Sequence, residues 1–426
     1  MSGTAGLNDK LKLEELENGT KLLTVDRSHQ GVVSATIYFY FKVGSRNEPT
    51  DQHGIAHFVE HMLFKGTSQM PKLIDVIKIL DNLGITFNAF TDKHTTGYHF
   101  KFLSNPDSLA TICRIAHQMF YYSLFRASDI KKECDVIIEE YNATMNDPSS
   151  LFDELLEAVY FKNSSLEHMI SGSPESLRAI KRRDITEFHR RYYNPENLAI
   201  VIGGKIPPNA SEIIGNKFGH VRRILKIDEI TLQPKINPFI PIFNTSQLII
   251  PREMEQNIIA IIFPTAGLAD ERRFILIYLK KLLGSCMSSR LFVNIRAKLG
   301  LVYTISANIN NYLEGGYFSI DFQTNPKATK RCISAVEKEL AIIREKGFSR
   351  EEFTRIRNNY ISEIFMSLEY NNMITEFYGE QLLYYNKIET FETYFEKIKN
   401  VNLSDINKLA TSFLKKYKII IYGRSI

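Results

Sequence analysis

The stretch Gly54-Ile55-Ala56-His57-Phe58-Val59-Glu60-His61-Met62-Leu63-Phe64 decides how the rest of this chain is interpreted. It has no internal proline and is predicted to form a helix. Positions i and i+4 of a helix lie one turn apart on one face, so His57 and His61 can chelate one metal ion. Glu60 comes three residues after His57 and one before His61, so it lies close to such an ion without binding it. The stretch therefore predicts a metal-binding helix with an adjacent carboxylate.

A third protein ligand is expected further along the chain, in Glu133-Cys134-Asp135-Val136-Ile137-Ile138-Glu139-Glu140-Tyr141. Glu133 and Glu140 are seven residues apart and share a helical stripe, whereas Glu139 points about 100° away from Glu140. We therefore assign Glu140 as the ligand and Glu133 as an acid that orients or charges the site. The pair would also fit a solvated helix face, and spacing alone does not require the two segments to meet.

Two imidazoles and one carboxylate are a ligand set typical of catalytic zinc, and the histidine motif is the zincin motif in reverse order. A zinc ion held in this way would lower the pKa of a water to about 7 and polarise a substrate carbonyl. Glu60 would then take the proton and deliver it to the leaving amine, which typically contributes about 10²–10⁴-fold. The alternative is that a lone HxxEH motif lies on a polar helix face by chance.

The chain carries a weak internal repeat at an offset of about 220 residues. Residues 184–203 are predicted to form a helix, a short loop and an apolar strand, and residues 405–423 repeat this order. Six of the 14 prolines fall between positions 205 and 251, which is typical of a linker. We place the domain boundary near 225–245, with an N-terminal catalytic domain at 1–230 and a homologous C-terminal domain at 231–426.

Strands and helices mix within each half. Early strands followed by helical runs predict an α+β fold of two homologous domains, each with a mixed or antiparallel sheet packed with helices. The strand candidates in the first half are rich in Tyr, Phe, Thr and Ile: 21–26, 33–43 and 95–103. The helix candidates are 54–64, 72–83, 106–122, 128–145, 150–161 and 184–192.

Composition excludes several classes of protein. The net charge of +5, from 53 basic and 48 acidic residues, is mild and spread along the chain, which does not favour binding of nucleic acid. No apolar stretch approaches the ~20 residues that a membrane helix needs, so no membrane partner is expected. The N-terminus lacks the apolar region of a secretory signal. We expect a soluble intracellular protein, either cytoplasmic or in an organelle matrix after removal of a presequence.

With these motifs in view, the chain resembles the pitrilysin-type metallopeptidases, the family of insulysin and the mitochondrial processing peptidase. The resemblance spans nearly the whole chain and rests on seven segments: 54–67 (Gly-Ile-Ala-His-Phe-Val-Glu-His-Met-Leu-Phe-Lys-Gly-Thr), 88–91, 135–140, 170–173, 192–198, 289–292 and 296–303. The resemblance implies that His57, His61 and Glu140 bind zinc, that Glu60 is the general base and that Glu133 supports the site.

Two further pairs of residues follow from the resemblance alone. Asn88 and Ala89 match the family's edge strand, which binds the substrate backbone by adding it as a further strand. Arg296 and Tyr303 match a pair that reaches the substrate and its oxyanion, and guanidinium and phenol groups are suitable donors toward developing negative charge. Without the family, a surface arginine and a strand tyrosine would be the simpler interpretation.

The length resembles half of the long single-chain relatives, and small relatives pair two such chains into a clam-shaped chamber. We therefore expect a homodimer, or a heterodimer with a related chain. The second half has no HxxEH motif, which implies one active site and one zinc ion per chain.

The leading hypothesis is a zinc metalloendopeptidase that acts on peptides or unfolded segments. The alternatives are the catalytic subunit of a presequence-processing heterodimer and a non-catalytic structural subunit of the same fold. The complete set of His57, Glu60, His61 and Glu140 argues against the structural subunit.

Overall fold

The computed structural model describes residues 9–222, 246–385 and 388–424. It divides into two compact units. The first unit comprises Met1–Lys235 and Leu368–Glu392, and the second comprises Ile236–Ser367 and Thr393–Ile426. The predicted boundary near 225–245 lies outside the described residues. Leu368–Glu392 belongs to the first unit although it falls within the predicted C-terminal range of 231–426.

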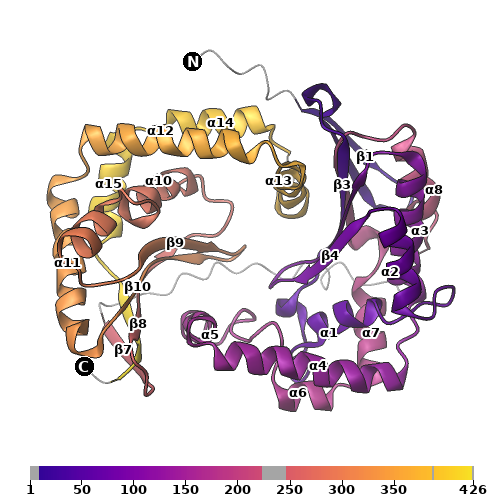
Figure 1. Cartoon of the computed structure of the whole chain (residues 1–426), viewed down its shortest axis with the longest axis horizontal. Coiled ribbons are helices and arrows are strands. Elements are labelled where there is room, and N and C mark those ends of the chain that lie inside the picture. The colour runs from indigo at the N-terminus through magenta and orange to yellow at the C-terminus, as the bar shows by residue number, and fades with distance from the viewer. Residues whose placement is uncertain (1–8, 223–245, 386–387, 425–426) are drawn as a thin grey trace. The chain divides into compact units, whose positions relative to one another are not determined.

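The first unit contains a six-stranded mixed sheet in the order β1-β2-β6-β3-β5-β4. Figure 1 labels its strands β1, β3 and β4. Its strands are β1 (Lys10–Glu15), β2 (Lys21–Asp26), β3 (Ser34–Phe41), β4 (Thr86–Thr91), β5 (Thr96–Leu103) and β6 (Leu198–Gly204). Strands β2 and β6 run parallel, and every other neighbouring pair is antiparallel. Strand β4 is therefore an edge strand, paired on one side with β5.

Nine α-helices of the described residues belong to the first unit: α1 (Ile55–Leu63), α2 (Leu73–Asn82), α3 (Pro106–Tyr122), α4 (Ala127–Asn146), α5 (Pro148–Tyr160), α6 (Pro174–Ala179), α7 (Arg182–Tyr192), α8 (Ala210–Phe218) and α13 (Asn371–Tyr384). Three short 3₁₀ helices accompany them: η1 (Ser28–Gln30), η2 (Ser45–Asn47) and η3 (Pro195–Asn197).

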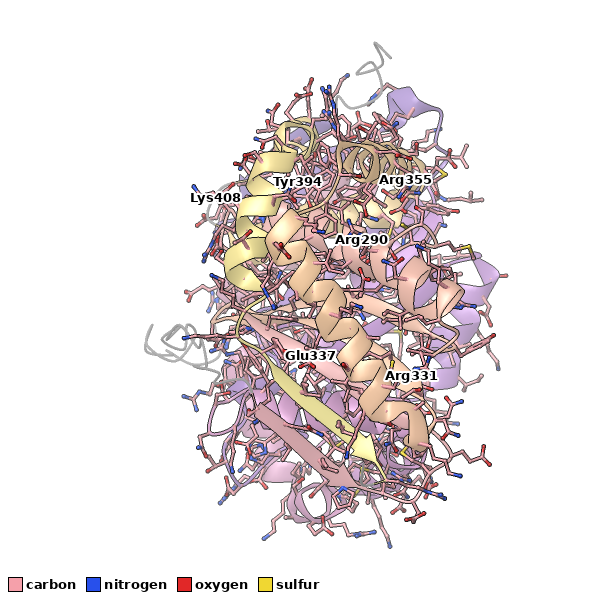
Figure 2. All side chains as sticks on the ribbon, turned by 90° about the vertical axis from the view of Figure 1, so that its left-hand side faces the viewer. Arg290, Arg331, Glu337, Arg355, Tyr394 and Lys408 are labelled. Atoms are coloured by element: carbon pink, nitrogen blue, oxygen red, sulfur yellow. The ribbon has the colours of Figure 1, made fainter. Side chains whose placement is uncertain are left out.

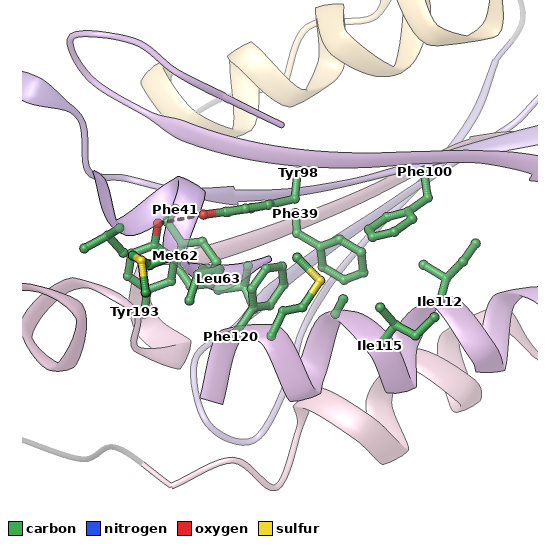
Figure 3. Packing of buried hydrophobic residues seen from close by; sticks show 14 of the residues in the cluster. Phe39, Phe41, Met62, Leu63, Tyr98, Phe100, Ile112, Ile115, Phe120 and Tyr193 are labelled. Carbon is green, nitrogen blue, oxygen red and sulfur yellow. Dashed lines mark hydrogen bonds between the residues drawn. The ribbon is translucent and has the colours of Figure 1, made fainter. Parts of the chain in front are cut away.

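The main core of the first unit lies between one face of the sheet and helices α1, α3, α7 and α8. Strand β3 shows why, because its β-branched and aromatic residues suit a sheet and its side chains alternate between the two faces. Phe39 and Phe41 point into this core and contact Phe120 of α3, with ring centroids 5.4 and 5.0 Å away (Figure 3). Met62 and Leu63 of α1 join the same cluster, so the helix that carries His57 and His61 is anchored to the core.

Helix α13 covers the opposite face of the same sheet, against β3 and β6 (Figure 1). Tyr38 and Tyr40 of β3 point toward this side, where their rings stack 5.1 Å apart. Two glycines permit the close approach of the helix. A Cβ atom at Gly203 would lie 2.1 Å from Oγ1 of Thr375, and one at Gly379 would lie 2.6 Å from the ring of Tyr40. Strands β3 and β6 of this sheet are therefore buried on both faces.

The second unit contains a five-stranded sheet in the order β7-β11-β8-β10-β9. Its strands are β7 (Ser246–Pro251), β8 (Asn257–Thr265), β9 (Ile305–Asn311), β10 (Gly316–Thr324) and β11 (Lys418–Gly423). Its helices are α10 (Arg273–Gly284), α11 (Thr329–Lys346), α12 (Arg350–Ser367), α14 (Phe391–Asn400), α15 (Leu403–Phe413), the 3₁₀ helix η5 (Pro326–Ala328) and the π-helix η4 (Phe292–Lys298).

Ion pairs and hydrogen bonds tie the helices of the second unit to its sheet and loops. Figure 2 shows α11 crossing in front of the sheet, with Arg331 and Glu337 along its length. The carboxylate of Glu337 accepts a hydrogen bond of 2.7 Å from the hydroxyl of Tyr417, next to β11. Arg290 donates two hydrogen bonds of 2.6 Å to Glu352 of α12.

The two sheets share one connectivity. Strands β7, β11, β8, β10 and β9 repeat the order of β2, β6, β3, β5 and β4, and in each sheet the first of these pairs is parallel and the rest are antiparallel. The predicted α+β class with two similar halves is thereby confirmed. The predicted dimer concerns a second chain and stays a prediction.

No helix within residues 9–222, 246–385 and 388–424 is both long enough and apolar enough to cross a bilayer.

Candidate metal centre

Helices α1 and α4 bring three potential ligand atoms together. The Nε2 atoms of His57 and His61 lie 3.2 Å apart, because one turn of α1 separates the two residues. Oε2 of Glu140 lies 3.8 Å from Nε2 of His57 and 3.6 Å from Nε2 of His61. Among the residues that the structure describes, these three form the one group of His, Cys, Asp or Glu side chains compact enough for a metal ion.

The triangle of ligand atoms fits zinc. A tetrahedral zinc ion with bonds of about 2.0–2.1 Å to nitrogen holds neighbouring ligand atoms roughly 3.3 Å apart. The three separations, 3.2, 3.6 and 3.8 Å, are close to this value. Only small side-chain movements are needed to bind an ion, and three protein ligands leave a fourth position open for a substrate or water.

A chain of charged groups orients His61. Its Nδ1 lies 3.1 Å from Oε2 of Glu133, and Oε1 of the same carboxylate lies 2.6 Å from the ammonium of Lys65. A proton on Nδ1 that is donated to Glu133 leaves the lone pair on Nε2 free for a metal. Burial would raise the pKa of Glu133, but its hydrogen bonds with His61 and Lys65 outweigh burial and lower the pKa. Glu133 therefore lies where it can support the site.

Glu60 is buried beside the ligands and held by strand β4. Its Oε2 accepts a hydrogen bond of 2.8 Å from the hydroxyl of Thr91, the last residue of that strand. Burial raises the pKa of Glu60, and the hydrogen bond from Thr91 opposes this shift. The other carboxylate oxygen is left available, so Glu60 can exchange a proton with a group at the metal centre.

The two histidines differ in their surroundings. Burial and the nearby His61 lower the pKa of His57 to about 4, so the imidazole of His57 is neutral at physiological pH. For His61, burial would lower the pKa, but the hydrogen bond with Glu133 and the charges of Glu140 and Glu60 raise it. Nδ1 of His57 is buried and has no hydrogen-bond partner within the described residues.

Asn88 and Ala89 lie in the middle of edge strand β4. The side chain of Asn88 is exposed and its Oδ1 accepts a hydrogen bond of 2.9 Å from the backbone N–H of Ala89. The strand continues to Thr91, which contacts Glu60. An extended peptide that pairs with β4 would therefore run along a strand connected to the proposed base.

Arg296 and Tyr303 both belong to the second unit, and they contact each other there. The guanidinium carbon of Arg296 lies 5.3 Å from the ring centroid of Tyr303 and 4.6 Å from that of Phe292. Arg296 is part of the π-helix η4, and helices of this type are frequent at functional sites. Tyr303 is 75% exposed, so its hydroxyl can reach a ligand.

Sequence reasoning gave no role to Thr91 or Lys65, although both stand in the motifs that carry the resemblance. Each acts through a contact between separate elements: Thr91 with Glu60, and Lys65 with Glu133. Helical spacing could not reveal these contacts. The sequence carries no signal for Lys65 in particular, because Lys131 and Lys132 lie closer to Glu133 along the chain.

Comparison with known families gives two matches within one family. The family described as "Insulinase (Peptidase family M16)" matches residues 24–173, and the family described as "Peptidase M16 inactive domain" matches residues 179–360. The first match contains His57, Glu60, His61 and Glu140, and the second contains Arg296 and Tyr303.

Similar proteins agree with these matches. An uncharacterised zinc protease of Bacillus subtilis is 27% identical over 97% of this chain and 98% of its own length. An uncharacterised zinc protease of Streptomyces coelicolor is 26% identical over 94% of this chain and 86% of its own length. The crystal structure of a protease from Helicobacter pylori, 19% identical, has the same fold, with a TM-score of 0.88 over 97% of this chain and all of that chain.

Proposed function

The chain belongs to peptidase family M16, and we propose that it is a zinc metalloendopeptidase that hydrolyses peptide bonds in peptides or unfolded segments. Similarity to proteins named zinc proteases supports zinc and proteolysis in general. The observation that carries the finer proposal is the compact triangle of His57, His61 and Glu140 next to the buried carboxylate of Glu60. We propose one zinc ion per chain, held by those three side chains.

Each residue has a separate role in this proposal. A bound zinc ion supplies Lewis acidity, which lowers the pKa of a water and polarises the scissile carbonyl. Glu60 accepts the proton of the attacking water through the carboxylate oxygen that Thr91 leaves available, and returns it to the leaving amine. Glu133, which is itself held by Lys65, keeps the proton of His61 on Nδ1.

Substrate binding is assigned to an edge strand and to a pair of donors. We propose that the substrate backbone extends the sheet at β4, along Asn88 and Ala89, because the outer side of this strand has no neighbouring strand within the described residues. We further propose that Arg296 and Tyr303, which contact each other, donate hydrogen bonds to the substrate and its developing oxyanion.

The central test separates proton transfer from metal binding. We would measure cleavage of a fluorogenic peptide library and zinc content for the wild type, Glu60→Gln and Glu140→Gln. Glu60→Gln should keep zinc and lose about 10²–10⁴-fold in kcat, because only the proton acceptor is removed. Glu140→Gln should lose zinc together with activity.

Glu139→Gln is the matched control, because Glu139 is exposed, adjacent to Glu140 and outside the ligand triangle. It should keep both zinc and activity. A wild-type protein without bound metal would disprove the proposal. Full activity of Glu60→Gln would remove that residue from the mechanism.

A further inference from the structure

The first turn of helix α1 is capped by a side chain that lies six residues before the cap position. The N-terminal N–H groups of a helix have no partners within the helix, and a side chain at the cap position usually satisfies them. Gly54 occupies that position and has no side chain. The carboxylate of Glu48 acts as the cap instead. Its Oε2 accepts a hydrogen bond of 2.9 Å from the N–H of Gly54, and its Oε1 accepts one of 2.9 Å from the N–H of Ala56.

Glu48 is almost completely buried, with 1% of its side chain exposed. A buried carboxylate is costly unless hydrogen bonds and opposite charge compensate it. Here both oxygens bind backbone N–H groups, the positive end of the α1 dipole faces them, and Nδ1 of His53 lies 3.7 Å away. The cap is thus a fixed internal contact of the fold.

A second contact holds the same end of α1. Gly54 and Gly172 both have left-handed backbones, with φ of 95° and 72°, and pack directly on each other. A Cβ atom at Gly54 would lie 2.7 Å from the carbonyl oxygen of Ser171, and one at Gly172 would lie 2.4 Å from that of His53. The hydroxyl of Ser176 also donates a hydrogen bond of 2.7 Å to the carbonyl of His53. This packing explains why the segment 170–173 needs a glycine.

The N-terminal end of α1 matters most for His57, which follows Gly54 by less than one turn. His61 is oriented by Glu133 through its second ring nitrogen. The corresponding atom of His57, Nδ1, makes no hydrogen bond to any described residue. The direction in which His57 presents Nε2 therefore depends on the backbone of α1, whose first turn Glu48 holds.

We propose that Glu48 is a positioning residue for the metal centre: by capping α1, it fixes the place of His57 among the ligands. This inference rests on the proposed function, because it assumes that His57 binds zinc. Groups that hydrogen-bond directly to a metal ligand typically change metal affinity by about 10–100-fold when they are removed, and we expect an effect no larger than this from a cap that acts through the backbone.

The test compares Glu48→Gln with a matched cap variant, Asn105→Ala. Glutamine keeps the volume of Glu48 but only one acceptor oxygen, so the fold is retained and half of the cap is lost. Asn105 caps α3, which carries no proposed ligand, by accepting a hydrogen bond of 2.7 Å from the N–H of Ser108. The readouts are zinc affinity, by competition with a chromophoric chelator, and the visible spectrum of the cobalt(II)-substituted protein, which reports ligand geometry.

Glu48→Gln should bind zinc more weakly than the wild type, by no more than about 10–100-fold, and alter the cobalt spectrum. Asn105→Ala should leave both unchanged. Wild-type zinc affinity and an unchanged spectrum in Glu48→Gln would overturn the inference, as would an equal effect of Asn105→Ala. A wild type that binds zinc at these residues but cleaves no peptide would refute the proposed function alone, because neither readout depends on catalysis.

Discussion

Helices α1 and α10 hold equivalent positions in the two units. Helix α1 packs against β4, α4 and α7, and helix α10 packs against β9, α12 and α15. Strands β4 and β9 are the corresponding edge strands of sheets with the same connectivity. The two units share this arrangement of helices and strands, but the side chains that face each other between the helices are different.

Between α1 and α4, two imidazoles face a carboxylate. Between α10 and α12, the ammonium of Lys281 donates to the carboxylate of Glu363 and lies 4.6 Å from the ring centroid of Tyr360. Each pair of helices thus sets a carboxylate of the longer helix toward a position suited to a cation. In the second unit the cation is the ammonium of Lys281, whereas in the first unit we propose an exchangeable zinc ion. Duplication of the fold therefore did not require duplication of the site.

The largest expected effect is the loss of activity when the proposed zinc ligand His57 is removed. The matched change in the second unit removes Lys281. His57→Ala should lower kcat/KM by about 10³-fold or more, because Lewis-acid catalysis contributes several kcal/mol. Lys281→Met, in the corresponding helix of the second unit, should leave kcat/KM of the folded protein unchanged. Cleavage of a fluorogenic peptide measures both. Equal inactivation by Lys281→Met would show that the two sites are not functionally distinct.

Removal of zinc should destabilise the units unequally. Zinc at a concentration of about 1,000 times its dissociation constant contributes roughly 4 kcal/mol to the stability of the unit that binds it. Treatment with a chelator should therefore speed hydrogen exchange in α1 and α4, and leave α10 and α12 unchanged. Uniform loss of protection across both units would contradict the assignment of zinc to the first unit alone.

Mild acid should also destabilise the first unit, which contains all 10 histidines of the chain. Burial lowers the pKa of His189 to about 4, below its value of about 6.5 in an unfolded chain. The unfolded state then binds more protons between these pH values, so stability falls as the pH decreases. The expected loss from pH 7.5 to 5 is about 2 kcal/mol for this residue.

Denaturant unfolding at the two pH values measures the effect of acid on the first unit. His189→Gln is the control, because its amide can still donate to the carbonyl of Phe120, which lies 2.8 Å from Nε2 of His189. It should reduce the pH dependence by about the same 2 kcal/mol. An unchanged pH dependence in His189→Gln would exclude this histidine as the cause.

The smallest expected effect is that of Glu363→Gln, which leaves Lys281 without its anion. Glu363 is partly exposed, so the loss of stability should be about 1 kcal/mol. Thermal unfolding measures it, and zinc content should not change. A loss of zinc in this variant would mean that the lysine pair supports the metal centre after all.

Local features were predictable from the sequence. Helix α3 spans Pro106–Tyr122, as predicted, and α4 spans Ala127–Asn146, where 128–145 was predicted. Periodic apolar residues mark both helices, and the side chain of Asn105 caps the start of α3. The same periodicity puts His57 and His61 on one face, and the structure has their Nε2 atoms 3.2 Å apart.

Contacts that depend on how the chain folds back on itself were not predictable in this way. Nothing near Glu48 in the sequence marks it as the cap of a helix that begins after Gly54, because the chain must first turn back on itself. Likewise, the pattern of Asn371–Tyr384 predicts no particular sheet for α13 to cover. That choice depends on small residues, Gly203 and Gly379, which are far apart in the chain and meet only in the folded protein.

The position of α13 has a consequence for how such a protein can change over evolutionary time. Leu368–Glu392 belongs to the first unit, while the chain before and after it belongs to the second. A gene divided once between the units would encode one product whose Tyr40 has lost its cover, and another that carries the covering helix without its sheet. One recombination event therefore cannot exchange a gene segment that encodes one complete unit and nothing of the other. Each must be inherited with a piece of the other.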